Sequence, residues 1–208
     1  MLDLIWLTLL FSLRIVMATP RVLLLGHSFL KRMHQLIRNP SNALREDLGI
    51  SLPCTFKWHG IGGRTVAKVL HNDLGIVKAF SPDVVILQLG TNDLSQQPAA
   101  TVGSQIEDLV RHLHDHCGVK LIYVCQTIRR ETASVGFNAK TRLLIQYLRV
   151  VLEPLPYAIY WAHRGFWNTS SRIFLHDGVH LNGLGQYKLY RSYRGAVLNA
   201  LRLIPSPT

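Results

Sequence analysis

Four short segments carry residue types that could together hydrolyse an ester. Ser28 stands in RVLLLGHSFLK (21–31), where a nucleophile follows an apolar run and a glycine. A serine hydroxyl is a weak nucleophile and needs a base to take its proton. The segments HGIGGRTV (59–66), LGTND (89–93) and DGVHLN (177–182) could supply backbone N–H groups, an amide and an imidazole. These residue types point to acyl transfer through a serine.

The base of this set is predicted to be His180. Asp177 lies three residues earlier, in a turn that contains a glycine. That spacing lets the carboxylate accept a hydrogen bond from Nδ1–H and leaves Nε2 free to face Ser28. Four other histidines stay open as rival bases: His27, His59, His163 and His176.

The remaining pieces could stabilise an oxyanion. The Ser28 N–H would belong to a helix N-terminus, where the helix dipole favours negative charge. The glycines of 60–63 offer unhindered N–H groups, Asn92 can donate from its amide, and Asp93 can fix its own loop. Each piece also has a purely structural interpretation: Ser28 as a helix N-cap, the glycine run as a turn, and the Asn-Asp pair as an Asx turn.

The elements that must position these groups alternate along the chain. Apolar runs predict strands over 22–25, 54–58, 84–89, 120–125 and 157–161. Helical spacing predicts helices from Ser28 to about residue 38 and over 41–48, 65–78, 101–117, 137–152 and 183–203. Such alternation is typical of a parallel sheet covered on both faces. Right-handed crossovers favour a flavodoxin-like three-layer α/β/α sandwich with a five-stranded parallel sheet in the order 2-1-3-4-5.

This topology predicts where the site lies. Ligands of open α/β sheets bind beyond the carboxyl ends of the strands. Ser28, the glycine run 60–63 and the segment 90–93 each follow a predicted strand. We therefore expect these three segments to meet at one edge of the sheet.

The domain organisation predicted for the 208 residues is one domain over 21–203, an apolar N-terminal segment over 1–20, and a tail over 204–208. The uninterrupted apolar part of the first segment is too short to span a bilayer. Arg14 interrupts it, and its first residues, MLD, carry no side-chain cation. A packed helix, a weak anchor and a signal peptide over 1–18 stay open. The location of the protein therefore stays open: the sequence favours an intracellular protein over a secreted one, which would require residues 1–18 to be a signal peptide.

Charge and cysteine content narrow the class of protein. The net charge of +11 favours anionic partners, although the basic residues are scattered. A solvated helix face is the simplest interpretation of the densest basic cluster, Lys188, Arg191, Arg194 and Arg202. Cys54 and Cys125 fall in strand-like runs, which predicts buried free thiols. The sequence lacks an acidic metal cluster, so a metal-dependent phosphatase or nuclease is disfavoured and no metal site is expected.

The four segments together resemble the SGNH hydrolase (GDSL-like esterase/lipase) superfamily over about 21–203. The family blocks correspond to GHS (26–28), a glycine of IGGRT, GTND (90–93) and DGVH (177–180). The resemblance implies Ser28 as nucleophile, His180 as base and Asp177 as the group that orients it. It also implies an oxyanion hole made by the N–H groups of Ser28 and Gly63 and the side chain of Asn92. Four further residues are expected to support these loops: Gly26, Gly90, Thr91 and Asp93.

One position departs from the family pattern, because His27 stands where the family usually has Asp. The resemblance implies a monomeric hydrolase of carboxylic esters, with short acyl or O-acetyl groups on sugars, lipids or small molecules, and no cofactor. The alternative function is a weak or inactive module of this fold that binds an anionic polymer, nucleic acid or acidic glycan, through its basic surface.

Two loops are expected to form the walls of the pocket, residues 126–136 and 160–172. Aromatic residues there could stack on a sugar or pack an acyl chain, namely Trp161, Phe166 and Trp167. Basic residues could meet an anionic group, namely Arg129, Arg130 and Arg164. Core packing or solvation of the loops stays open for all six.

Overall fold

A five-stranded parallel sheet in the order β2-β1-β3-β4-β5 organises the computed structural model, which describes residues 19–132 and 135–204. Its strands are β1 (Arg21–Gly26), β2 (Thr55–Gly60), β3 (Val84–Gln88), β4 (Leu121–Cys125) and β5 (Ala158–Trp161). The predicted three-layer sandwich and strand order are confirmed. The N-terminal segment falls outside the described residues up to residue 18, and so does the tail from residue 205.

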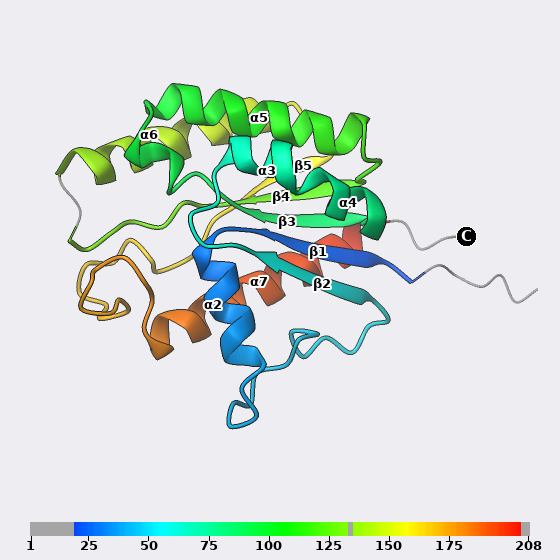
Figure 1. Cartoon of the computed structure of the whole chain (residues 1–208), viewed down its shortest axis with the longest axis horizontal. Coiled ribbons are helices and arrows are strands. Elements are labelled where there is room, and N and C mark those ends of the chain that lie inside the picture. The colour runs from blue at the N-terminus through cyan, green and yellow to red at the C-terminus, as the bar shows by residue number, and fades with distance from the viewer. Residues whose placement is uncertain (1–18, 133–134, 205–208) are drawn as a thin grey trace, which may run out of the picture.

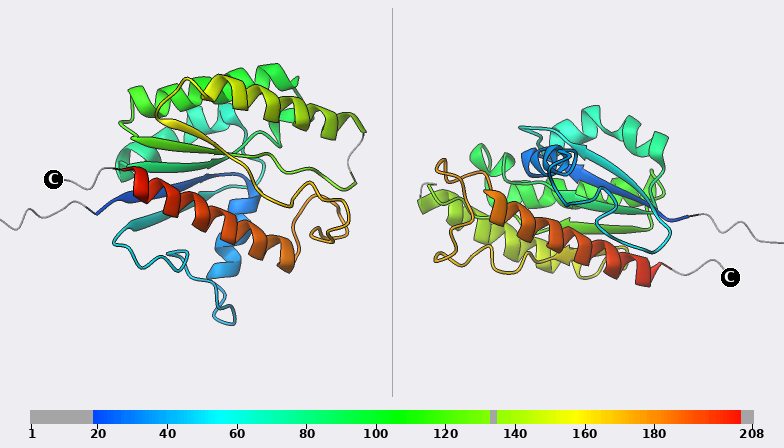
Figure 2. Two further views of the ribbon diagram at one scale, coloured as in Figure 1. Left: turned by 180° about the vertical axis from the view of Figure 1, so that it is seen from behind. Right: turned by 90° about the horizontal axis from the view of Figure 1, so that it is seen from below.

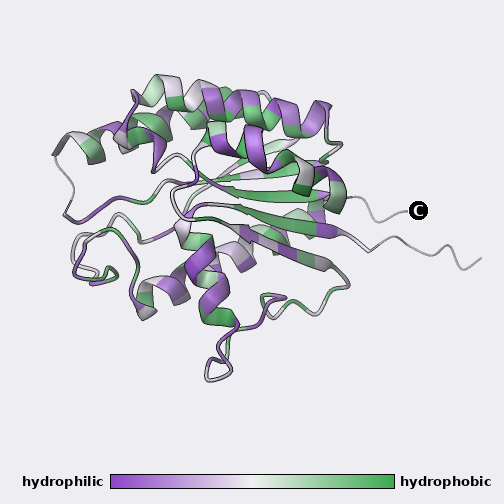
Figure 3. Ribbon diagram, viewed as in Figure 1, coloured by the Kyte–Doolittle hydropathy of each residue, from purple (hydrophilic) through white to green (hydrophobic). Residues whose placement is uncertain are grey.

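Helices cover both faces of the sheet (Figures 1 and 2). One face carries α3 (Val66–Asn72), α4 (Leu74–Phe80), α5 (Ala99–Asp115) and α6 (Val135–Leu152), and the other carries α2 (Ser28–Ile37) and α7 (Gly183–Leu203). In β1, Leu23 and Leu25 pack into the first core while Val22 and Leu24 pack into the second. The unbroken apolar run of this strand follows from burial on both faces (Figure 3).

The prediction of one helix over 65–78 is wrong, because Asp73 divides the segment into α3 and α4. The Asp73 carboxylate is buried, and its Oδ1 accepts a 2.8 Å hydrogen bond from Nη2 of Arg64. The same oxygen lies 3.1 Å from Nε2 of His59. These contacts hold Asp73 against the segment after β2. The apolar spacing of the sequence continues across the break and conceals it.

The helix predicted over 41–48 is also wrong, since this segment forms turns. Its polar side chains accept hydrogen bonds from nearby backbone N–H groups: Asn39 from Ser41, Asn42 from Leu44, and Asp47 from Gly49. Leu48 adopts a φ of 57°. Asn and Asp side chains that bond locally in this way compete with the helical pattern.

The two cysteines of strand-like runs differ. Cys125 is buried, as predicted, whereas Cys54 is only partly buried and precedes β2, so that part of the prediction is wrong.

No helix among the described residues is both long and apolar enough to cross a membrane.

A buried polar network joins β3, the ends of β4 and β5, and α7 around His163. Its Nε2 lies 2.8 Å from Oε1 of Gln88, which also accepts from the hydroxyl of Tyr193. Its Nδ1 lies 2.7 Å from Oγ of Ser192, which in turn accepts from the indole N–H of Trp161. The amide oxygen of Gln88 can only accept, so Nε2 of His163 carries the proton, and the hydroxyl of Ser192 donates to Nδ1.

This network predicts a loss of stability in mild acid. Burial lowers the pKa of His163 from 6.5 to about 3. Below about pH 6.5 the unfolded chain therefore takes up a proton that the folded protein does not, and the free energy of unfolding falls as the pH drops toward about 3. At pH 5 we expect His163 to account for a loss of about 2 kcal/mol. Buried His27, whose pKa burial also lowers to about 3, should add a similar loss.

Urea unfolding at about pH 7.5 and about pH 5 measures this effect. The difference between the two pH values should be about 2 kcal/mol smaller in His163→Gln than in the parent protein. Exposed Ser104, changed to Ala, serves as the control for substitution itself and should leave the pH dependence as it is, because it removes no group that titrates between about pH 5 and about pH 7.5. Equal pH dependence in His163→Gln and the parent protein would contradict the prediction.

Candidate active site

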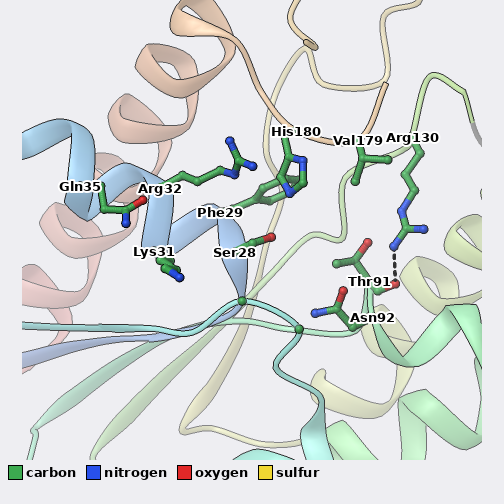
Figure 4. A pocket seen from close by; sticks show the side chains of 12 residues that line it. Ser28, Phe29, Lys31, Arg32, Gln35, Thr91, Asn92, Arg130, Val179 and His180 are labelled. Carbon is green, nitrogen blue, oxygen red and sulfur yellow. Dashed lines mark hydrogen bonds between the residues drawn. The ribbon is translucent and has the colours of Figure 1, made fainter. Parts of the chain in front are cut away.

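Ser28 begins α2 directly beyond the carboxyl end of β1. A Cβ at Gly26 would lie 2.2 Å from the carbonyl oxygen of Gln88, so only glycine lets β1 and β3 approach this closely where the chain turns. Ser28 is not the N-cap of α2, because Nδ1 of His27 accepts the 3.4 Å hydrogen bond from the N–H of Phe29. The Ser28 side chain therefore has no capping role and faces a hollow (Figure 4).

His27 occupies this cap as a neutral ring. It is fully buried, and burial, followed by the nearby charges of Arg130 and His180, lowers its pKa to about 3. A neutral imidazole nitrogen can accept the same backbone N–H that a carboxylate would accept. Although His27 replaces the usual Asp, its Nδ1 still provides a hydrogen-bond acceptor at the start of α2.

The groups that could receive an oxyanion lie around Ser28. Gly63 and Asn92 line the same hollow as Ser28. Nδ2 of Asn92 donates a 2.9 Å hydrogen bond to the carbonyl oxygen of Arg64, which fixes the orientation of the amide because that oxygen can only accept. The second N–H of Nδ2 makes no hydrogen bond with the described residues, so it can donate to a ligand. Within the described residues, no hydrogen bond uses the N–H of Ser28 or Gly63.

The residues expected to support these loops occupy distinct places. Gly90 has a φ of 98°, and its carbonyl accepts the N–H of Leu94. Buried Asp93 accepts the N–H of Val66 at 2.9 Å and so ties this loop to the start of α3. Burial raises the pKa of Asp93. Thr91 lines the hollow, and its carbonyl accepts a 3.1 Å hydrogen bond from Arg130.

Asp177 and His180 form a closed turn. Oδ2 of Asp177 lies 2.7 Å from Nδ1 of His180, and Oδ1 accepts the N–H groups of Val179 and His180 at 2.9 and 2.8 Å. The N–H of His180, its ring and the N–H of Val179 hold the pKa of the Asp177 carboxyl well below its usual range. The ring therefore presents Nε2 to the hollow.

Two neighbouring segments hold this turn in place. Asn182 caps α7 by accepting the N–H of Gly185 and donates to the carbonyl groups of Arg172 and Phe174. The loop after β4 contacts the turn from its other side, where the hydroxyl of Thr132 donates to the carbonyl of Asp177 at 2.7 Å. A Cβ at Gly178 would lie 2.4 Å from that threonine side chain, so a glycine is needed at this contact.

The structure brings the predicted groups together around one hollow of about 510 Å³. Ser28 and His180 both line it, and no hydrogen bond joins them in this structure. The four rival histidines are absent from its lining: His27 is buried, His59 is beside Asp73, His163 is in the buried network, and His176 is exposed. Catalytic hydrogen bonds in unliganded enzymes are often long and tighten only when substrate binds.

The walls of the hollow differ in part from the expectation that residues 126–136 and 160–172 form them. Arg130 lines the hollow, whereas Trp161, Phe166 and Trp167 do not. Phe166 is buried in the core and Trp161 lines a separate depression. Sequence reasoning missed three wall residues on α2, namely Lys31, Arg32 and Gln35. Lys31 and Arg32 lie three and four residues after Ser28, so helical spacing alone could have identified them.

Among residues 19–132 and 135–204, no group of three or more His, Cys, Asp or Glu side chains is placed to hold a metal ion. The charged groups that surround Ser28 are therefore an imidazole–carboxylate pair and several basic side chains. This arrangement suits proton transfer to and from a serine hydroxyl.

Comparisons with known proteins bear on the family and the fold of the chain. The model of the GDSL-like lipase/acylhydrolase family matches residues 25–188. A GDSL-like lipase from Bacteroides thetaiotaomicron superposes with a TM-score of 0.67 at 15% identity, over 86% of this chain and 88% of the other. A catalytic mutant of an acetylxylan esterase from Geobacillus stearothermophilus gives 0.63 at 14% identity, over 84% and 92%.

An acetyl esterase mutant with acetate ion has a TM-score of 0.66 at 15% identity, over 89% of this chain and 100% of the other. No curated protein matches the sequence. At these identities the solved structures establish the fold, while the family model places most of the chain within one family.

Proposed function

The chain belongs to the GDSL-like lipase/acylhydrolase family, and from that premise we propose that it is a serine esterase that hydrolyses short acyl or O-acetyl esters through an acyl-Ser28 intermediate. One observation carries the proposal. Ser28, the Asp177-oriented His180, and the oxyanion donors Gly63 and Asn92 surround a single hollow although they come from separate parts of the chain.

In the proposed first half-reaction, Nε2 of His180 takes the hydroxyl proton while Oγ of Ser28 attacks the ester carbonyl. The negative charge that develops on the carbonyl oxygen is received by the N–H groups of Ser28 and Gly63 and by the free amide N–H of Asn92. His180 then gives the proton to the departing alcohol oxygen. The acyl group remains on Ser28.

The second half-reaction releases the acid. His180 removes a proton from water, which attacks the acyl-Ser28 carbonyl, and the same donors receive the oxyanion. The proton returns to Oγ of Ser28. The ionised Asp177 stabilises the imidazolium in both halves, which is consistent with the low pKa of its carboxyl.

A short acyl group is proposed because the lining is mostly polar. Among the described residues of the lining, Phe29 and Val179 are the only large apolar ones, and neither builds a tunnel for a long chain. The acetyl esterase and the acetylxylan esterase among the structural neighbours support an acetyl group. The test is turnover of 4-nitrophenyl acetate by the purified protein, with mass spectrometry of the Ser28 peptide after treatment with a fluorophosphonate. Absence of both turnover and adduct would overturn the proposal.

A second candidate function, a weak or inactive module that binds an anionic polymer, is favoured by a different depression. This depression of about 570 Å³ places the indole of Trp161 beside Arg164, Lys188 and Arg191. None of the three cations forms an ion pair within the described part of the chain. Aromatic faces beside cations are typical of sites for nucleic acids and acidic glycans.

This second function predicts binding of heparin or single-stranded nucleic acid that weakens steeply between about 50 and about 200 mM salt. Changing both Arg164 and Arg191 to Gln should reduce the affinity and flatten the salt dependence. The matched control changes Arg38 and Lys78 to Gln, two exposed cations that lie outside this depression. Equal affinity in the Arg164/Arg191 variant and the parent protein would eliminate the depression as the binding site.

A further inference from the structure

The hollow around Ser28 is strongly basic. Lys31, Arg32 and Arg130 line it, and its lining includes no carboxylate from residues 19–132 or 135–204. The nearest acid in sequence to the catalytic base, Asp177, is engaged with His180. Figure 4 shows Lys31 and Arg32 on one side of Ser28 and Arg130 on the other. A bound substrate would therefore lie between positive charges.

Arg130 is the most informative of the three. Its Nη2 donates to the carbonyl of Thr91 at 3.1 Å, and its guanidinium lies 4.0 Å from the ring centroid of Phe137. Its Nε is buried without a hydrogen-bond partner, and burial lowers the pKa of the side chain. Within the described residues no carboxylate pairs with it. A guanidinium that is partly removed from water without a counter-charge is poised to bind an anion.

Lys31 and Arg32 extend the basic lining along α2. Both are exposed, and neither forms an ion pair among the described residues. A further depression of about 360 Å³ shares Arg32 and Gln35 with the hollow. The accessible surface thus continues from Ser28 along this helix and leaves room for an alcohol portion larger than an acetyl group.

We propose that the substrate is a short-acyl ester of a polyol that carries a carboxylate, sulfate or phosphate group, as in an O-acetylated acidic sugar. This inference rests on the proposed esterase function. An acetyl group has no charge, so the anion belongs to the alcohol portion. Arg130, Lys31 and Arg32 bind the anion, while Gln35, Thr91 and Asn92 offer hydrogen bonds to hydroxyl groups.

The test compares two matched probes, an O-acetylated methyl glucuronoside and its carboxamide, which differ in one charge. Release of acetate gives kcat/KM for each. At about 20 mM salt we expect the carboxylate probe to be favoured by about tenfold, mainly through KM, and we expect this ratio to shrink at about 500 mM salt. The ratio should fall toward one in Arg130→Gln and in the double variant Lys31→Gln/Arg32→Gln.

The double variant keeps the test valid if Arg130→Gln fails to fold, because Lys31 and Arg32 are exposed. Arg202→Gln removes an equal charge at the far end of α7 and should keep the ratio of the parent protein. Equal turnover of the two probes, or turnover of 4-nitrophenyl acetate but of neither probe, would overturn the substrate class and leave the esterase intact. Absence of all Ser28-dependent turnover would overturn the esterase function itself.

Discussion

Replacing Ser28 by alanine is expected to lower kcat/KM for 4-nitrophenyl acetate by about a thousandfold or more. The loss follows because, among the residues that the structure describes, Thr91 is the only other hydroxyl residue that lines the hollow, and Thr91 is buried. The oxyanion donors and the binding surface remain, so a small residual rate should persist. Initial rates, followed by nitrophenolate release, measure the effect.

The alanine variant should still fold, which separates lost chemistry from lost structure. Ser28 does not cap α2, and alanine has the highest helix propensity. Exposed Ser104 on α5, changed to alanine, is the matched control and should keep the parent rate. A Ser28→Ala protein that is within about tenfold of the parent rate would show that another group is the nucleophile.

Replacing His180 by alanine is the second large expected effect, a loss of about a thousandfold in kcat. His180 is the only histidine in the lining that the structure describes, and without its Nε2 the proposed nucleophile Ser28 loses the group proposed to take its proton. The cavity that the variant leaves beside Asp177 should admit free imidazole. Added imidazole is therefore expected to restore part of the rate, which it could not do for Ser28→Ala.

The control for this variant is His176→Ala, four residues earlier on the same exposed segment. It should retain the parent rate. If His176→Ala loses activity while His180→Ala keeps it, the base has been assigned to the wrong histidine. Imidazole that raises the rate of Ser28→Ala to the same degree as that of His180→Ala would also argue against the Asp177–His180 pair.

The sequence predicted the sheet because its signals are local. The apolar runs of β1 and β3 are buried on both faces, and Asn182 marks the start of α7 by its own capping contacts. The break at Asp73 was not predictable, since it depends on contacts with Arg64 and His59 that exist only after folding. In the same way, the turns over 41–48 arise from side chains that bond to nearby backbone N–H groups.

The candidate site, like the fold, combines residues that local sequence signals predicted with contacts that form only after folding. Residue types and spacing pointed to Ser28, Asn92, Asp177 and His180, because each follows a strand or occupies a short turn. The contacts that hold these residues could not be predicted, because they join segments that are distant in sequence. The hydroxyl of Thr132 donates to the carbonyl of Asp177, and the amide of Asn92 donates to the carbonyl of Arg64. For the aromatic residues of 160–172 the sequence left both a pocket wall and core packing open, because composition cannot distinguish the two.

The positions of Ser28 and His180 along the chain have a consequence for synthesis of the protein. Ser28 follows the first strand, and His180 precedes the last helix, α7, whose packing completes the second core. The turn that carries His180 is fixed partly by the capping of that helix. A growing chain can therefore complete most of its sheet on the ribosome while the nucleophile still has no base beside it. The proposed activity would therefore require that α7 has left the exit tunnel and has packed on the sheet.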